Sequence, residues 1–103
     1  MAVCEPMVEA KLLFGLTDEA AFVRFLDANV TPRFPDGLTV LSGAGRWRAP
    51  DGRMTQEASR LVLIVAARGT ETMVRLQAIR TAYKAAFRQQ SVGLTLSTTC
   101  ADF

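Results

Sequence analysis

The stretch SRLVLIVAA at residues 59–67 decides the fold. Five apolar residues follow one another at positions 61–65, without the alternation of a strand that has one face in water. The run is the longest apolar run in the chain, yet it is much shorter than the roughly 20 residues of a transmembrane helix. We therefore expect residues 59–67 to form a central strand, covered on both faces, in a protein without a transmembrane segment.

Two other segments alternate apolar and polar residues with the period of two that is typical of strands. The first of them covers residues 8–16, and its apolar positions are Val8, Ala10, Leu12, Phe14 and Leu16. The second covers residues 92–96 and fades into the polar run 97–99. These segments predict the first and the last strand of the chain.

Helical spacing of apolar residues predicts two helices. The first covers residues 18–30, begins after a capping hydroxyl on Thr17 and stops before Pro32. The second opens at residues 68–70, and its apolar stripe consists of Met73, Leu76, Ile79, Tyr83 and Phe87. Each helix follows one of the predicted strands.

Prolines and glycines define the middle of the chain. The proline-rich segment TPRFPDG at residues 31–37 forms a stiff connector that leads into a short strand at 38–41. Gly43 and Gly45 loosen that strand or make it bulge before residues 46–48. The sequence APDG at 49–52 predicts a turn, and residues 53–58 form its polar far arm.

The resulting order, β-α-β-β-α-β, predicts a single ferredoxin-like α+β domain over residues 1–103. Two right-handed crossovers interleaved in this way give an antiparallel sheet of order 4-1-3-2 with both helices on one face. The other face then carries Leu13 and half of the apolar run, which is more apolar surface than a monomer usually exposes. We therefore expect a homodimer through the open sheet face, of the dimeric α+β barrel type; a long tail or a ligand is the alternative cover.

The first and last strands are antiparallel neighbours in this topology. Pairing Val8 with Leu96 aligns the core faces of both strands, and the same register sets Cys4 opposite Cys100. The cysteines are then close enough for a disulfide, provided that the compartment is oxidising. Because Pro6 interrupts the ladder between them, the bridged and the free forms both stay open.

Charge and composition exclude several classes of function. Ten of the twelve cationic residues are arginine, which favours an anionic partner but is equally what a GC-rich genome produces. Histidine is absent, so catalytic triads and zinc sites are excluded. The net charge of +2 and the lack of exposed aromatic sheet motifs argue against nucleic acid. No nucleotide-binding motif is present beyond a bare GxG, so we expect no cofactor.

Four segments of the chain together resemble the bacterial family called domain of unknown function 3574. They are KLLFGL at 11–16, VTPRFPDGLTV at 30–40, GRWR at 45–48 and IRTAYK at 79–84. The resemblance implies no activity, but it implies an export or lipoprotein leader in many members. This chain has no hydrophobic leader, which predicts a cytoplasmic protein as written and a periplasmic or exported one if a leader was removed. It also has Gln90 where relatives carry glutamate.

Two parts of the chain are candidate ligand sites. Arg33 and Asp36 are charged residues on the stiff connector, where they serve a ligand or, as the alternative, form an ion pair that caps a turn. Trp47 is flanked by arginines, so it would stack on a planar ligand while Arg46 holds a carboxylate or phosphate. The alternative places Trp47 in the dimer interface.

A third candidate lies on the second helix. Tyr83 and Lys84 are residue types that act in acid–base catalysis when they are buried or desolvated. Their positions on the apolar and basic stripes of the helix favour the simpler interpretation, in which Tyr83 belongs to the core and Lys84 to the solvated face.

Two hypotheses follow. In the first, the protein is a cofactor-independent enzyme or binder for a small planar or anionic molecule: Arg33, Arg46 and Lys84 bind the anion, Trp47 stacks, and Asp36 or Tyr83 moves a proton. In the second, it is a non-catalytic binding or assembly module, for instance at the cell envelope. A pocket that contains Trp47 and a convergent arginine favours the first hypothesis. A Trp47 buried between subunits favours the second.

Overall fold

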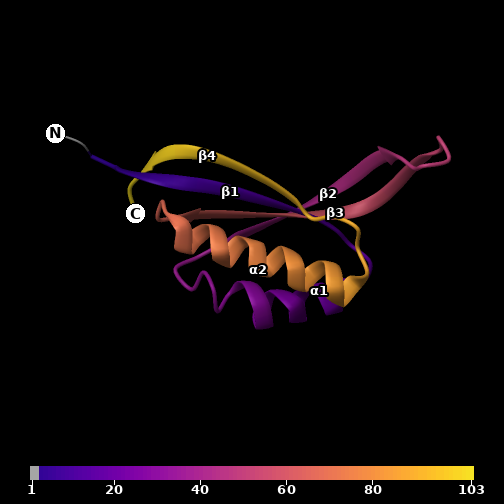
Figure 1. Ribbon diagram of the computed structural model, residues 1–103, viewed down its shortest axis with the longest axis horizontal. Coiled ribbons are helices and arrows are strands. Elements are labelled where there is room, and N and C mark those ends of the chain that lie inside the picture. The colour runs from indigo at the N-terminus through magenta and orange to yellow at the C-terminus, as the bar shows by residue number, and fades with distance from the viewer. Residues whose placement is uncertain (1–2) are drawn as a thin grey trace.

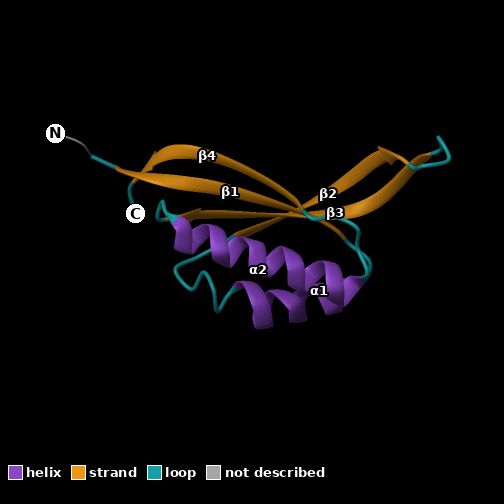
Figure 2. Ribbon diagram, viewed as in Figure 1, coloured by secondary structure: helices purple, strands orange, loops and turns teal. Residues whose placement is uncertain are grey.

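The apolar run at residues 61–65 lies in an inner strand of the sheet, as expected. The computed structural model describes residues 3–103, and its strands are β1 (Glu5–Gly15), β2 (Thr39–Arg48), β3 (Met54–Ala66) and β4 (Gly93–Ala101). They form one antiparallel sheet of order β2-β3-β1-β4, which is the predicted order counted from the other edge. The helical segments α1 (Glu19–Phe25), η1 (Leu26–Val30) and α2 (Thr70–Phe87) cover one face of this sheet (Figures 1 and 2).

The core lies between the sheet and the helices. Even-numbered residues of the two inner strands point toward the helices, because side chains alternate along a strand. These are Ala10, Leu12 and Phe14 of β1 and Val62 and Ile64 of β3, all of them buried. The odd-numbered Leu61, Leu63 and Val65 lie on the open face and are only half buried, so the single chain leaves uncovered the face that the predicted dimer would cover.

The helical segments differ from the prediction in detail. Asp18 rather than Thr17 caps α1, since its Oδ1 accepts a hydrogen bond from the backbone N–H of Ala21 at 3.1 Å. The first helix widens into the π-helical η1, whose last bond joins the N–H of Thr31 to the carbonyl of Leu26 at 2.9 Å. None of the helices within residues 3–103 is long and apolar enough to cross a membrane.

An aromatic cluster fills the end of the core nearest the C-terminus of α2. Tyr83 is fully buried and packs against Phe14, Phe22, Phe25 and Phe87, with ring centroids 4.4 to 6.2 Å apart. Its hydroxyl donates a hydrogen bond to the backbone carbonyl of Gly15. Burial, and secondarily the negative charge of Glu57, raise the pKa of Tyr83 above its ordinary 10.0.

Strands β2 and β3 form a long arm that projects beyond the helices (Figure 1). The ladder runs without interruption from the pair Thr39 and Leu63 to the pair Arg48 and Met54. The expected bulge at residues 42–45 is therefore wrong, and the polar segment 53–58 belongs to β3. The glycines serve packing instead, because a Cβ on Gly43 would lie 3.1 Å from Oγ of the opposite residue, Ser59. The arm gives the molecule its extent of 54 × 27 × 22 Å.

The register of β1 against β4 is shifted by two residues from the prediction. Val8 lies opposite Thr98 rather than Leu96, which leaves the core faces aligned. The shift arises because Val92 does not begin the strand: it is buried in the loop before β4, where its carbonyl accepts a hydrogen bond from Arg80 Nε at 2.8 Å. Pro6 is part of the ladder and does not interrupt it, since β3 has already ended beside it.

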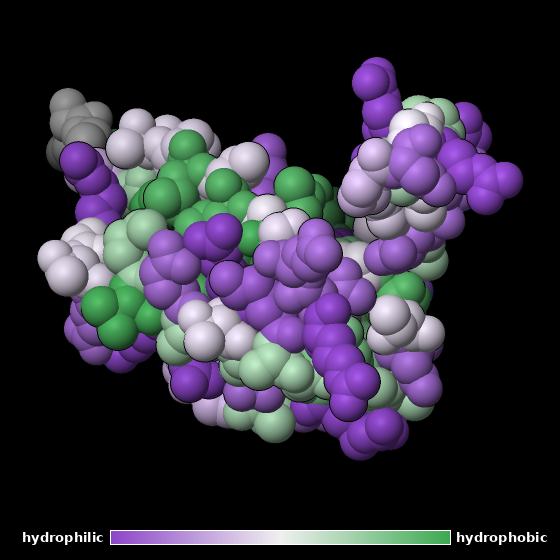
Figure 3. Space-filling model, turned by 45° about the vertical axis from the view of Figure 1, so that its right-hand side comes forward, coloured by the Kyte–Doolittle hydropathy of each residue, from purple (hydrophilic) through white to green (hydrophobic). Residues whose placement is uncertain are grey.

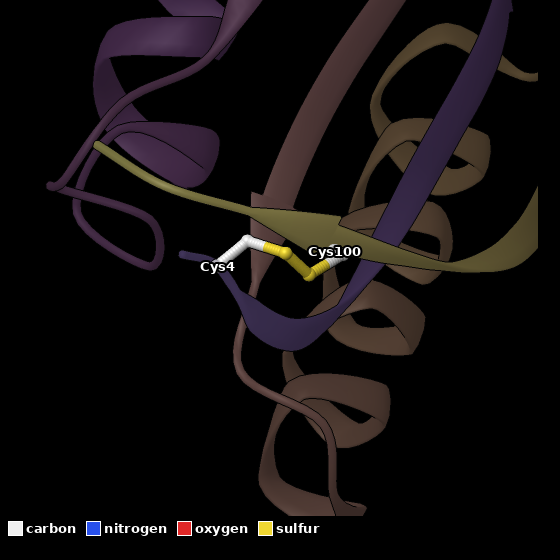
Figure 4. Close-up of a disulfide and its surroundings, with 2 residues drawn as sticks. All are labelled: Cys4 and Cys100. Carbon is white, nitrogen blue, oxygen red and sulfur yellow. A yellow bond between two sulfur atoms is a disulfide. The ribbon is translucent and has the colours of Figure 1, made fainter. Parts of the chain in front are cut away.

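A disulfide joins Cys4 to Cys100 beside this ladder (Figure 4). The two cysteines are not directly opposed, because Pro6 is the residue that pairs with Cys100. Their Cα atoms are 5.3 Å apart, which is ordinary for a disulfide. The bond closes a loop of almost the whole chain, with a sequence separation of 96 residues.

Breaking this bond should lower stability substantially. In the chain-entropy model, a loop of this length stabilises the folded state by about 4.7 kcal/mol. We expect Cys100→Ser to lower the free energy of unfolding by about 2–5 kcal/mol in urea titrations. A reducing agent should destabilise the wild type equally and leave the variant unchanged. Equal stabilities of oxidised and reduced wild type would contradict the prediction.

The buried hydroxyl of Tyr83 predicts a specific dependence on pH. Tyr83→Phe should lower the free energy of unfolding by about 1 kcal/mol at pH 7, because Gly15 loses its donor. The pKa of Tyr83 is raised on folding, so the stability that its hydroxyl contributes is complete below pH 10 and is lost at higher pH. Urea titrations should therefore show the gap between wild type and variant closing above pH 10. A gap that stays constant up to pH 11 would refute this.

Candidate functional site

A groove of about 1080 Å³ lies at the base of the arm. One wall comes from β2 and β3, the floor from the end of β1, and the other wall from the loop between α2 and β4. Figure 3 shows the hollow beside the projecting arm, with hydrophobic surface gathered in it. Its lining contains Trp47, Glu57 and Gln89 together with four arginines, Arg46, Arg48, Arg60 and Arg88.

Two glycines make room for two of these side chains. The ring of Trp47 lies over Gly45, where an added Cβ would be 3.4 Å from its Cζ3. The carboxylate of Glu57 lies directly over Gly15, where an added Cβ would collide with its Oε1. Trp47 and Glu57 occupy the same face of the arm, because both have odd numbers in a ladder without bulges and Glu57 is the cross-strand partner of Gly45.

The end of α2 places the amide of Gln89 in the same corner. Arg88 has the left-handed φ of 53° that ends many helices, and its N–H and that of Gln89 both bond to the carbonyl of Lys84. The chain then turns toward β1, so that Gln89 Oε1 lies 3.3 Å from the position of a Cβ on Gly15. A half-exposed indole, a carboxylate and an amide thus line one groove, which suits ring stacking and hydrogen bonding.

The structure separates the predicted pair Arg46 and Trp47. Successive residues of a strand face opposite sides, so Arg46 points away from the indole. With the amide oxygen of Gln56 turned toward it, the guanidinium donates hydrogen bonds from Nη2 at 2.8 Å and from Nε at 3.0 Å. Both residues nevertheless line the groove, so the expectation that they hold one ligand stays a prediction.

The connector residues lie at the other end of the domain. Thr39, at the end of the connector, precedes Trp47 by eight strand residues, which is about 26 Å at ~3.3 Å per residue. Arg33 Nη1 donates a hydrogen bond to the carbonyl of Asn29 at 2.8 Å and so caps η1. Asp36 is exposed and does not pair with Arg33. The connector therefore contributes nothing to the groove.

Neither of the residues predicted on the second helix lines the groove. Tyr83 is fully buried with its hydroxyl already bonded, as the simpler interpretation expected. Lys84 is half buried on α2, and its carbonyl closes the end of the helix. Sequence reasoning missed Glu57 and Gln89. Alternation along residues 53–58 would have put Glu57 on the face of Trp47, had that segment been taken as strand.

Solved structures of similar fold include three of interest. A phage SAM lyase in complex with S-methyl-5'-thioadenosine has a TM-score of 0.68 at 15% identity, covering 92% of this chain and 90% of that chain. CutA from Synechococcus elongatus PCC7942 has a TM-score of 0.66 at 11% identity, with 97% and 83% covered. CPII from Thiomonas intermedia K12 is a nitrogen regulatory PII-like protein bound to ADP, AMP and bicarbonate. It has a TM-score of 0.56 at 12% identity, covering 95% of this chain and 97% of that chain. These likenesses establish the fold alone.

Sequence comparison identifies the family. No curated protein matches the chain significantly. The family model described as "Protein of unknown function (DUF3574)" matches residues 9–103, which includes every helix and nearly all of the sheet. The chain therefore belongs to the DUF3574 family of proteins of unknown function.

Proposed function

We propose that this protein binds a small molecule with a planar ring in the groove at the base of the arm. The observation that carries the proposal is the position of Trp47, whose side chain is 42% exposed and borders a groove large enough for a ligand. An indole in water offers a planar apolar surface on which an aromatic ring stacks favourably. Of the two expected ligand classes, planar and anionic, this geometry supports the planar one.

The structures of similar fold supply the first probes. The phage SAM lyase was solved with S-methyl-5'-thioadenosine, and the PII-like protein with ADP and AMP. Each compound contains a planar adenine ring of a size that the groove accommodates. Because fold does not imply function, these compounds serve as probes of the groove rather than as assigned ligands.

Binding is a better proposal than the predicted proton transfer. Asp36 lies at the far end of the domain, and Tyr83 is buried with its hydroxyl bonded to Gly15. A catalytic acid or base needs to reach the reacting atoms, and neither residue borders the groove. The proposal therefore assigns neither a reaction nor a cofactor.

A second proposal concerns assembly through the open sheet face. Leu41, Leu61 and Leu13 lie side by side across β2, β3 and β1, and Leu41 and Leu13 are 52% and 44% exposed. Beside them Lys11 Nζ lies 3.6 Å from Glu9 Oε1. A pair of opposite charges next to an apolar row is self-complementary under a twofold axis, so a second copy of the chain is the occupant that we propose. This supports a homodimer, whose interface would include Leu13, Leu41 and Leu61 of the groove lining.

The proposed compartment is an oxidising one, such as the periplasm or cell exterior. The disulfide between Cys4 and Cys100 supports this proposal, because such bonds persist mainly outside the reducing cytosol.

Ligand binding is tested by the fluorescence of Trp47, the single tryptophan of the chain. S-methyl-5'-thioadenosine, AMP and ADP should be titrated into the wild type, with quenching expected for at least one compound. The same compound should raise the melting temperature of the wild type but not of Trp47→Ala, because stacking on an aromatic side chain contributes about 1–3 kcal/mol. Absence of any spectral or thermal change up to millimolar concentration would overturn the proposal.

Dimerisation is tested by light scattering at micromolar concentration. The wild type should have the mass of two chains, and Leu41→Glu should have the mass of one, because a carboxylate would enter the apolar row. The control is Val74→Glu, which makes the same change at an exposed residue of α2 on the opposite side of the molecule and should remain dimeric. A monomeric wild type would end the dimer proposal.

A further inference from the structure

Glu57 is a carboxylate without a partner in the wall of the groove. It accepts no side-chain hydrogen bond and forms no ion pair with any of residues 3–103. It is nevertheless only partly exposed, and its Oε1 lies against the backbone at Gly15. A half-buried carboxylate usually has a donor beside it, since desolvation without a hydrogen bond is costly.

An amide oxygen shares the space above Gly15 with the carboxylate of Glu57. Gln89 Oε1 approaches the same point above Gly15, at 3.3 Å from an added Cβ. Four arginines line the groove, and none of them pairs with Glu57. Arg60 binds Glu19 and the carbonyl of Ser59, Arg46 binds Gln56, and neither Arg48 nor Arg88 forms an ion pair within residues 3–103. The negative charge of Glu57 therefore acts on its surroundings, and it contributes to the raised pKa of Tyr83.

The carboxylate also lies beside the stacking surface. Glu57 is the cross-strand partner of Gly45, over which the ring of Trp47 lies. A planar molecule stacked on Trp47 would thus present its edge to Glu57. Hydrogen-bond donors on that edge would point at the carboxylate, in the plane of the ligand's own ring. A cationic planar donor such as an amidinium forms two parallel hydrogen bonds with a carboxylate, and an acid in the same position would be repelled.

We infer that Glu57 selects the ligand of the groove, and that this ligand is a planar molecule with a cationic or hydrogen-bond-donating edge rather than an acid. The inference rests on the proposed function, because it requires that the groove binds a planar molecule. It departs from the expectation of an anionic ligand, which depended on Arg33 and Arg46. Arg33 does not line the groove, and the guanidinium of Arg46, which does, is bonded to Gln56.

The test compares two probes of the same shape and opposite charge. Benzamidine is a cationic planar donor at pH 7, and benzoate is an anionic planar acceptor. Both are titrated against the oxidised wild type, and affinity is read from the NMR signal of the Trp47 indole N–H, which is unique in the chain. We expect benzamidine to bind about tenfold more tightly than benzoate, as a charge-assisted hydrogen bond predicts.

The variants separate a local effect of Glu57 from a general effect of net charge. Glu57→Gln keeps the shape and removes the charge, so the preference for benzamidine should fall to about twofold or less. Glu71→Gln removes the same charge near the start of α2, outside the groove, and should keep the wild-type preference. An unchanged preference in Glu57→Gln, or an equal loss in both variants, would overturn the inference.

The remaining outcomes distinguish this inference from the proposed function. If an adenine compound perturbs Trp47 but benzoate binds as tightly as benzamidine, or neither benzene probe binds, the role of Glu57 is refuted while planar binding stands. If no adenine compound and no benzene probe perturbs Trp47, both proposals fail together.

Discussion

The uninterrupted ladder between β2 and β3 is the constraint on which the other features depend. Its register extends from the pair Thr39 and Leu63 in the domain body to the pair Arg48 and Met54 near the tip of the arm. Because no bulge intervenes, the side-chain alternation of the core continues into the arm. Even-numbered residues such as Val62 therefore face the helices, and odd-numbered residues such as Trp47 and its partner Thr55 face the other side of the sheet. Both the groove and the apolar row of the open face follow from this alternation.

Much of the fold was predictable because it rests on short-range patterns. Alternation at residues 8–16 and the apolar run at 61–65 identified the inner strands, and helical spacing identified α2 with its buried Tyr83. Local patterns carry no information on how far a ladder extends past the core, because solvated strand residues need not be apolar. The arm was therefore assigned as a bulge, a turn and a polar segment. The register of β1 against β4 was predicted two residues away from the observed one, because Val92 was taken as part of the strand and lies in the loop before it.

The site was less predictable than the fold for a physical reason. Trp47 was identified because tryptophan beside arginine is chemically distinctive, whereas Glu57 stood in a segment described only as the polar far arm of a turn. The importance of Glu57 depends on Gly15, which comes from another strand 42 positions away in the sequence and admits the carboxylate because it has no Cβ. In a sequence, a glycine at the end of a strand indicates only that the strand stops there. Only the tertiary structure reveals which side chain fills the space above it.

Gly15 also connects the groove to the core. Its carbonyl accepts the hydrogen bond of Tyr83 on the helix side, while Glu57 and Gln89 approach it on the groove side. The aromatic cluster thus fixes the backbone against which the carboxylate rests, and the rigid β-ladder fixes the strand that carries Glu57. A binding site built on strands and anchored to a packed core holds its groups in place without a ligand. In the proposed function the same rigid frame presents two side chains to a ligand, Trp47 to its ring and Glu57 to its edge.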